Sequence, residues 1–132
     1  MQITIMTLIL AIMSVESGGE RFPNRAIGDG GASVGCLQIG KAVVDDVNRV
    51  TGSNYTYADR NDREKSVAIC EAYLIYWGDY YHRQTGKRPT AEVYAKLWNG
   101  GALAWKKTDP AVVKNLDRYW SKVHRTLTKG IK

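Results

Sequence analysis

The apolar positions along the chain fall into blocks separated by glycine-rich or polar stretches. Residues 2–17 are apolar on nearly every face, a pattern typical of a helix in the centre of a core, and Gly18 and Gly19 end this block. Residues 20–34 are rich in Gly, Asn and Asp, which indicates a long loop or a few short irregular strands. We expect at most a small β-hairpin, between residues 22 and 40, and a loop of this length inside one domain is often functional.

Helical spacing and end signals predict two helices in the middle of the chain. The first spans about residues 41–51 and stops at Gly52, because glycine readily adopts the left-handed conformation found after helices. The second opens with a capping box formed by Asn61 and Glu64 and ends before Gly86. Its expected apolar stripe consists of Val67, Cys70, Leu74, Trp77 and Tyr81.

Two more helices are predicted near the C-terminus. Pro89 and Thr90 introduce the first, which Asn99 and the following two glycines close. Asp109 and Pro110 start the second, since an N-cap aspartate followed by proline is a typical helix opening. The side chains expected to face inward are Val93, Leu97, Trp98, Val113, Leu116, Trp120, Val123 and Leu127. The pattern predicts a single mainly α domain over all 132 residues, with about five helices around a buried N-terminal helix.

The chain is basic and rich in aromatic residues. The formal net charge is +6, and the eight Tyr and four Trp suit either core filling or a groove that stacks on sugars or bases. Basic residues crowd the C-terminal fifth, at Lys106, Lys107, Lys114, Arg118, Lys122, Arg125, Lys129 and Lys132. Those from Lys114 to Lys129 recur every three or four residues and so share one helix face. That face is either simply solvated or a contact surface for an anionic polymer.

Cysteine and histidine usage argues against a disulfide framework and against a metal centre. Cys36 and Cys70 are too few for either, and both sit among apolar residues, so they are buried free thiols or form one disulfide. His82 and His124 lack partners at metal-ligand spacing. The sequence also contains no P-loop, dinucleotide fingerprint or Ser/His/Asp order, so we expect neither a metal nor a cofactor.

The apolar N-terminal block could be mistaken for a secretory signal. No Lys or Arg precedes Arg21, so the basic region that opens such signals is missing, and cleavage would destroy the segment around Glu16. The block is also too short and too interrupted to span a membrane. We therefore expect no signal peptide and no membrane insertion.

Glu16 is the carboxyl group with the clearest chemical context. It follows Ile12, Met13 and Val15 at the predicted end of the first helix, where the helix dipole and the scarcity of water both disfavour ionisation. We therefore expect a raised pKa for Glu16, and a carboxyl group that stays protonated near neutral pH can give its proton to a glycosidic oxygen. The alternative is a glutamate that is simply exposed at a helix end.

The segment from Glu16 onward resembles the signature of lytic transglycosylases and goose-type lysozymes. Glu-Ser-Gly-Gly at residues 16–19 precedes a glycine-rich loop and then Gly-Cys-Leu-Gln-Ile at residues 35–39, with Cys-Leu where the family usually has Leu-Met. Three later segments are similar to the family in the same order, at residues 62–77, 97–101 and 119–123. The resemblance covers nearly the whole chain and implies a lysozyme-like fold.

The resemblance also implies roles for individual residues. Glu16 would be the general acid/base, and Ser17 would support the helix end or make a hydrogen bond near Glu16. Gln38, as a donor, and Asn99 would line the glycan-binding cleft, where amides match sugar hydroxyls and N-acetyl groups. Tyr119 would reach toward Glu16 from the last helix.

Two further positions match the family less fully. Trp98 stands where Tyr is more usual, and for it, as for Tyr119, core packing competes with substrate contact. Asp29, thirteen residues after Glu16, matches one of the two goose-type lysozyme aspartates, whereas the other would fall at Gly40. Asp29 is therefore either a second catalytic carboxylate or a turn residue that bonds its own loop.

These roles imply a glycosidase that cleaves the β-1,4 bond between N-acetylmuramic acid and N-acetylglucosamine in peptidoglycan. A lysozyme would place a water with a second carboxylate. A lytic transglycosylase uses the 6-hydroxyl of the substrate and needs only Glu16, and this is the version we favour. The alternatives are an enzyme that cleaves chitin and a non-catalytic basic module that binds cell wall or nucleic acid.

The same resemblance also indicates where the protein acts, what it binds and whether it is a monomer. We expect a monomer that acts on peptidoglycan glycan strands in the periplasm or outside the cell, without a nucleic acid partner. A short basic domain of this type suits a phage lysis or virion protein, and it equally suits a domain of a larger bacterial protein.

Overall fold

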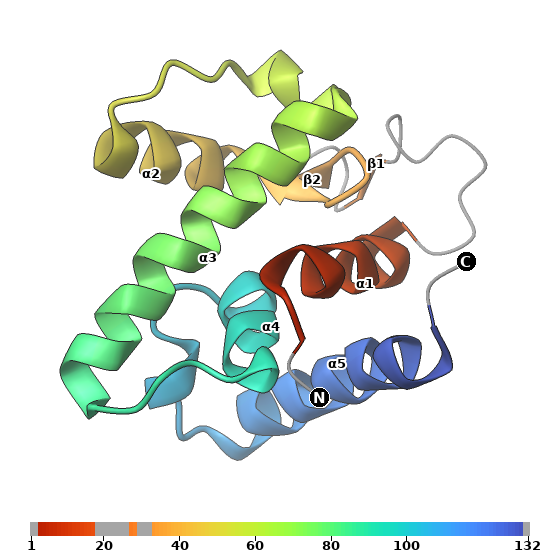
Figure 1. The fold of residues 1–132 in the computed structure, drawn as a ribbon, viewed down its shortest axis with the longest axis vertical. Helices are drawn as coiled ribbons and strands as arrows, with labels where there is room; N and C mark the ends of the chain where they lie inside the picture. Colours follow the sequence, from red (N-terminus) through yellow and green to blue (C-terminus); the bar gives the residue numbers. More distant parts are fainter. Residues whose placement is uncertain (1–2, 18–26, 29–32, 131–132) are drawn as a thin grey trace.

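The computed structural model describes residues 3–17, 27–28 and 33–130, and within them the chain is mainly helical (Figure 1). The helices are α1 (Ile5–Ser17), α2 (Lys41–Thr51), α3 (Arg63–Thr85), α4 (Ala91–Gly100) and α5 (Pro110–Lys129), with short 3-10 helices η3 (Tyr57–Asn61) and η4 (Ala104–Lys106). Three strands of two residues each complete the described part: β1 (Ile27–Gly28), β2 (Ser33–Val34) and β3 (Ile39–Gly40). The prediction of a mainly α fold with about five helices and very little sheet is confirmed.

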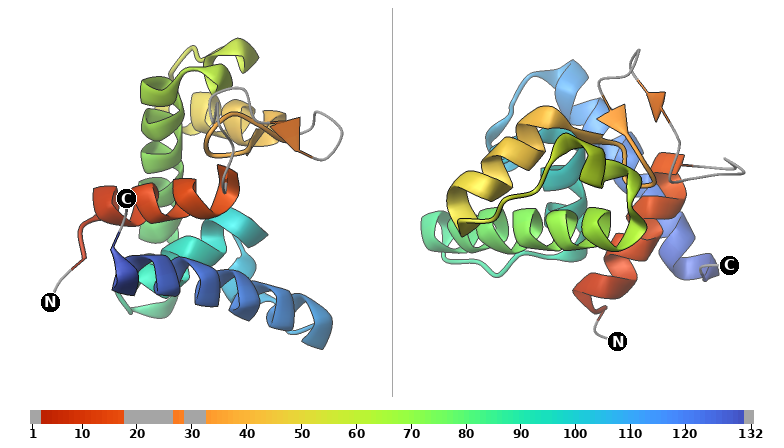
Figure 2. Two further views of the ribbon diagram at one scale, coloured as in Figure 1. Left: turned by 90° about the vertical axis from the view of Figure 1, so that its right-hand side faces the viewer. Right: turned by 90° about the horizontal axis from the view of Figure 1, so that it is seen from above.

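The first helix, α1, lies in the middle of the molecule, with the sheet and α2 on one side and α5 on the other (Figures 1 and 2). It contacts α3, α4 and α5. Its buried residues are Leu8, Ile9, Ala11, Ile12 and Met13. Near its start, however, the Ile3 and Met6 side chains remain 43% and 42% exposed. The apolar N-terminal helix is thus buried on the sides that meet the other helices, and one face near its start stays open.

The three strands form an antiparallel sheet in the order β1-β2-β3, one strand more than a single hairpin. The turn that joins β2 to β3 is closed by the backbone N–H of Gln38, which donates to the carbonyl of Gly35 at 3.0 Å. Pairing of these strands sets Ser33 opposite Gly40, where β3 runs directly into α2. The turn and β3 are anchored in the core by three fully buried side chains, Cys36, Leu37 and Ile39.

Most helix boundaries follow from local capping, as the sequence predicts. α4 begins after Thr90, whose side chain accepts a hydrogen bond from the backbone N–H of Val93. α5 begins after Asp109, whose carboxylate accepts from two backbone N–H groups of the first turn. α2 and α3 end at Gly52 and Gly86, which both adopt the left-handed conformation that favours glycine.

The start of α3 differs from the prediction. The expected capping box of Asn61 and Glu64 is wrong, because Asp62 is the N-cap and its carboxylate accepts a hydrogen bond at 2.9 Å from the backbone N–H three residues on. A capping box does occur one element earlier, where Thr56 and Asp59 cap η3. Since η3 continues through Asn61, the first position free to cap α3 is the next residue.

The predicted apolar stripes coincide only in part with the buried side chains. α3 contacts α2, α1 and α4 along its length, so its buried face is wider than one stripe. Buried side chains are Ile69, Cys70, Tyr73 and Leu74 on α3, Leu97 on α4, and Leu116, Tyr119 and Val123 on α5. Predicted positions that are only partly buried are Val67, Trp77, Tyr81, Val93, Trp98, Val113, Trp120 and Leu127. Both cysteines are buried free thiols, which settles the alternative left open by the sequence.

Among the described residues, none of the helices combines the length and the apolar character needed to cross a membrane.

Candidate active site

A polar groove of about 440 Å³ opens between the sheet and the C-terminal ends of α1 and α4. Its lining residues are Glu16, Ser33, Gln38, Gly40, Val43, Trp98 and Asn99. Four of the predicted site residues, Glu16, Gln38, Trp98 and Asn99, therefore come together here from separate segments of the chain. The volume is within the usual range for ligand sites, about 300–1,000 Å³.

A larger cavity, of about 720 Å³, lies between the start of α1 and the second half of α3. Its walls include Asp79, His82 and Arg88 beside apolar side chains such as Ile3 and Ile75, and none of the predicted site residues lines it. We take the smaller groove as the candidate active site because four of the predicted site residues meet there.

Glu16 lies in the last turn of α1, half-buried at the groove. The hydroxyl of Tyr119 donates a hydrogen bond to its Oε2 at 2.7 Å. Tyr119 projects from the buried face of α5 and is only 8% exposed. Burial first, and then the charge of Glu16, raise the pKa of Tyr119 well above its ordinary value, so this hydroxyl keeps its proton. The predicted reach of Tyr119 toward Glu16 is confirmed.

Gln38 occupies an uncommon backbone conformation at the edge of the groove, with φ at +51°. Its side-chain Nε2 donates to the carbonyl of Gly35 at 2.8 Å, alongside the backbone bond of the same turn. These two bonds fix the amide where it lines the groove. Gln38 therefore lies at the groove, as predicted, and its role in binding a glycan stays a prediction. An amide also has a carbonyl oxygen that can accept and a second N–H that can donate to a ligand.

Trp98 and Asn99 come from the last turn of α4. The indole Nε1 of Trp98 donates to the carbonyl of Leu37 at 3.3 Å, and its ring meets that of Tyr73 edge to face at 5.6 Å between centroids. Trp98 therefore ties the Gly35–Gln38 turn to α3, which supports its packing role. It also lines the groove, and its contact with a substrate stays a prediction. Asn99 beside it is exposed.

The close approach of α4 and α5 explains the glycine after Asn99. A Cβ on Gly100 would lie 2.6 Å from Cδ2 of Leu116 on α5, nearer than real Cβ contacts allow. The glycine thus reflects the tight packing of α4 on α5 near the site, where a larger residue would require the end of the Leu116 side chain to shift.

Ser17 and Asp29 complete the set of predicted site residues. The hydroxyl of Ser17 donates to the carbonyl of Met13 at 2.8 Å, so it supports the end of α1, and Ser17 is not among the lining residues of the groove. This is the first of the two roles considered for it, and substrate binding by Ser17 gains no support. Asp29 falls outside the described residues, and its role as a second carboxylate stays a prediction.

Three lining residues were not predicted from the sequence: Ser33, Gly40 and Val43. Ser33 enters the groove wall because the pairing of β2 and β3 sets it opposite Gly40. Val43 lies in the first turn of α2. Only the register of two-residue strands could have identified Ser33 and Gly40, and such short strands leave almost no alternation in the sequence.

The polar and aromatic groups among the described lining residues are one carboxyl group, two amides, one hydroxyl and an indole ring. Glu16 is the carboxyl group among the lining residues that the structure describes. In the described ranges no three His, Cys, Asp or Glu side chains gather where they could hold a metal ion. Beneath the site, burial and then the charge of Glu16 raise the pKa of the Cys70 thiol, so this thiol is unreactive. The arrangement suits a neutral polar ligand and one proton transfer.

Comparison with known proteins adds no family to this description. A scan against protein-family models finds no match to the chain, and a search of curated proteins finds none either.

Proposed function

We propose that this chain is a peptidoglycan-degrading glycosidase that cleaves the β-1,4 bond between N-acetylmuramic acid and N-acetylglucosamine, with Glu16 as general acid/base. The observation that carries the proposal is the Tyr119-held carboxyl of Glu16, which lines one groove together with Gln38 and Asn99. These are residues that the resemblance to lytic transglycosylases and goose-type lysozymes assigns to the glycan cleft.

Tyr119 gives the two oxygens of Glu16 different tasks in this proposal. Because the tyrosine keeps its proton and donates to Oε2, the proposal assigns the transferable proton of the carboxylic acid to Oε1. That proton passes to the glycosidic oxygen as the bond from the sugar C1 to this oxygen breaks. Tyr119 is thus a positioning residue, and Glu16 is the catalytic one.

The second half of the reaction returns the proton to Glu16. In the transglycosylase version the 6-hydroxyl of N-acetylmuramic acid attacks C1, its proton goes to the Glu16 carboxylate, and a 1,6-anhydro sugar forms without water. In the lysozyme version a water attacks, assisted by a second carboxylate such as Asp29. We favour the first version because one carboxyl group suffices for it, and Glu16 alone supplies a carboxyl among the described lining residues.

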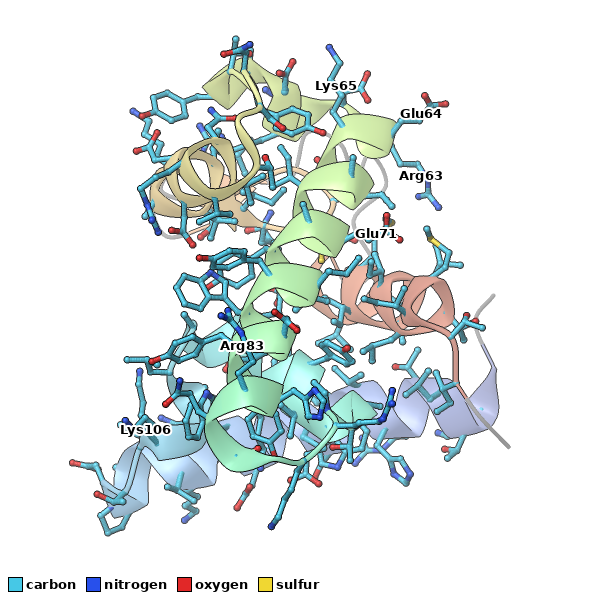
Figure 3. All side chains as sticks on the ribbon, turned by 60° about the vertical axis from the view of Figure 1, so that its left-hand side comes forward. Arg63, Glu64, Lys65, Glu71, Arg83 and Lys106 are labelled. Carbon is cyan, nitrogen blue, oxygen red and sulfur yellow. The ribbon has the colours of Figure 1, made fainter. Side chains whose placement is uncertain are left out.

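The test is the release of soluble fragments from purified peptidoglycan, with mass spectrometry of their ends. We expect anhydro ends from the unmodified protein and a loss of about 10²–10⁴-fold in rate for Glu16→Gln. Glu64→Gln is the matched control, because it makes the same chemical change on an exposed residue in the first turn of α3 (Figure 3).

Two outcomes would correct the proposal. Unchanged release of soluble fragments by Glu16→Gln would show that Glu16 is not the general acid. Fragments with reducing ends would show that the reaction is hydrolysis and not transglycosylation. In that case we expect Asp29→Asn to lower the rate of cleavage. Chitin oligosaccharides, assayed in parallel, separate a preference for chitin from one for peptidoglycan.

A further inference from the structure

The outer face of α5 carries a regular line of positive charge. Its members are Lys114, Arg118, Lys122, Arg125 and Lys129, and all five are exposed. At 3.6 residues per turn they fall within an arc of about 80° and extend over roughly 22 Å of helix axis. We call these five residues the α5 cationic face.

The α5 cationic face has no counter-charge among the described residues. The two acidic residues in or next to α5, Asp109 and Asp117, do not pair with these cations. Asp109 caps the helix by accepting from backbone N–H groups, and Asp117 pairs with Lys96 on α4 at 2.7 Å. None of the five cations makes an ion pair with a described acid, and Arg118 contacts its neighbour Asn115 at 3.4 Å. A line of like charges that the fold leaves unpaired costs helix stability, unless an external anion compensates it.

This face points away from the candidate active site. The buried side of α5, with Leu116, Tyr119 and Val123, packs toward α1 and α4, and the helix lies at one edge of the molecule (Figures 1 and 2). Figure 3 shows Lys106 beside the start of α5. A polymer bound along the outer side of α5 would leave the groove at Glu16 open.

We infer that the α5 cationic face binds a linear phosphodiester polymer attached to the cell wall. Successive cations are spaced by about 4.5–6 Å of axial rise, which suits a chain with one charge per repeat. Insertion into a membrane has no support, because the large exposed apolar side chains of the described part, Ile3, Met6, Tyr57, Ile75 and Leu103, all lie outside α5. The apolar side of α5 is occupied by the core.

The choice of a wall polymer over nucleic acid rests on the proposed function. A polymer attached to the glycan would hold the groove close to its substrate and raise the effective concentration of cleavable bonds. The binding itself is separate from cleavage, since no residue of the α5 cationic face lines the groove. The two proposals can therefore fail independently.

The test is binding to immobilised poly(glycerol phosphate) over a range of salt concentrations. The test variant is Arg118→Glu, Lys122→Glu and Arg125→Glu together, and the matched control is Lys65→Glu, Lys87→Glu and Arg88→Glu, with the same change in net charge at exposed positions. We expect at least tenfold weaker binding of the test variant and a slope of log affinity against log salt that is shallower by about 2. The control should stay within about threefold.

Equal losses in the two variants would overturn the inference, because net charge alone would then explain binding. Tighter binding to duplex DNA, or to vesicles with anionic lipids, would overturn the choice of partner. A second variant, Lys114→Gln, Lys122→Gln and Lys129→Gln, repeats the test with neutral side chains of similar length if the reversal disturbs α5. Glu16→Gln should bind the polymer as tightly as the unmodified protein does. The test variant should still cleave soluble glycan that lacks the polymer. Binding and cleavage are therefore measured separately, and a failure of the proposed cleavage would not affect the interpretation of the binding result.

Discussion

Glu16 and Tyr119 are 103 positions apart in the chain, yet their hydrogen bond defines the site more closely than any local feature does. The bond depends on the packing of α1 against α5, which brings the last turn of the first helix beside the middle of the last one. Burial keeps the tyrosine protonated, so it remains a donor at any pH at which the fold survives. One oxygen of the carboxyl group is therefore oriented before a ligand arrives.

We predict that Tyr119→Phe lowers kcat for peptidoglycan cleavage by about 10–150-fold, because a hydrogen bond to a charged group contributes about 1.5–3 kcal/mol. KM should change little, since Tyr119 is not among the lining residues of the groove. Steady-state kinetics on soluble glycan fragments measures both constants.

Tyr57→Phe is the matched control for this prediction. It also removes a tyrosine–carboxylate hydrogen bond, from the Tyr57 hydroxyl to Asp45 at 2.8 Å, on the exposed surface. Equal effects of the two substitutions on kcat would contradict a positioning role for Tyr119.

At the residue scale, the short sequence motifs predicted the site residues that belong to the motifs themselves. They did not predict site residues that lie outside the motifs. Glu16, Gln38, Trp98 and Asn99 could be assigned to one groove from the order of motifs, before any contact between them was known. Ser33 could not, because its place depends on a strand register that no periodic pattern encodes.

At the scale of elements, the Gly35–Gln38 turn is the tightest constraint near the site. Gly35 has φ at +89°, and a Cβ there would overlap the backbone carbonyl oxygen of Arg60. Arg60 is itself buried and donates through its guanidinium to the carbonyl of Ile39 at 3.1 Å. The turn is therefore clamped against the end of η3, and Gln38 is held at the groove by that clamp.

We predict that Gly35→Ala destabilises the protein by more than twice as much as Gly52→Ala. Both glycines have positive φ, which costs another residue about 1–2 kcal/mol, but a Cβ on Gly52 meets no atom within 4 Å. The difference therefore isolates the clash with Arg60. Urea denaturation followed by circular dichroism measures both free energies of unfolding, and equal losses would refute the clamp.

Helix ends were predictable because their signals lie within a few residues of the end itself. Thr90, Asp109, Gly52 and Gly86 all act where the sequence places them. The start of α3 was missed by one residue because η3 takes up Asn61, and a 3-10 helix has little sequence signature of its own. The third strand was missed for a similar reason, since two residues cannot display an alternating pattern.

At the scale of the whole molecule, two buried tyrosines join pairs of helices across the core. Tyr73 on α3 is 6% exposed, and its ring contacts Trp98 on α4. Tyr119 on α5 is held by Glu16 on α1. Ionisation of either phenol would place a charge inside the core, so the pH at which these tyrosines titrate limits the alkaline stability of the fold.

We predict that the free energy of unfolding falls steeply above about pH 10. Burial, followed by the charge of Asp46, raises the pKa of Tyr73 to about 12 from its ordinary value of 10.0. The native state then holds a proton that the unfolded chain has lost, so the stabilisation is complete below pH 10 and is lost as pH rises toward 12. Two units correspond to about 2.7 kcal/mol for Tyr73, and Tyr119, whose pKa is raised further, adds a loss in the same direction.

Urea denaturation at several pH values from 8 to 11 measures this dependence for the unmodified protein and for Tyr73→Phe. The substitution itself shifts stability by an amount that does not depend on pH, so only the slopes need comparison. We expect the slope of Tyr73→Phe between pH 10 and 11 to be shallower by up to about 1.4 kcal/mol per pH unit. Buried Cys36 and Cys70, whose pKa values burial also raises, add the same loss to both proteins from about pH 9 and cancel in the difference. Parallel slopes would mean that Tyr73 titrates alike in the folded and unfolded chains, and that the packing of α3 on α4 does not seal its hydroxyl from water.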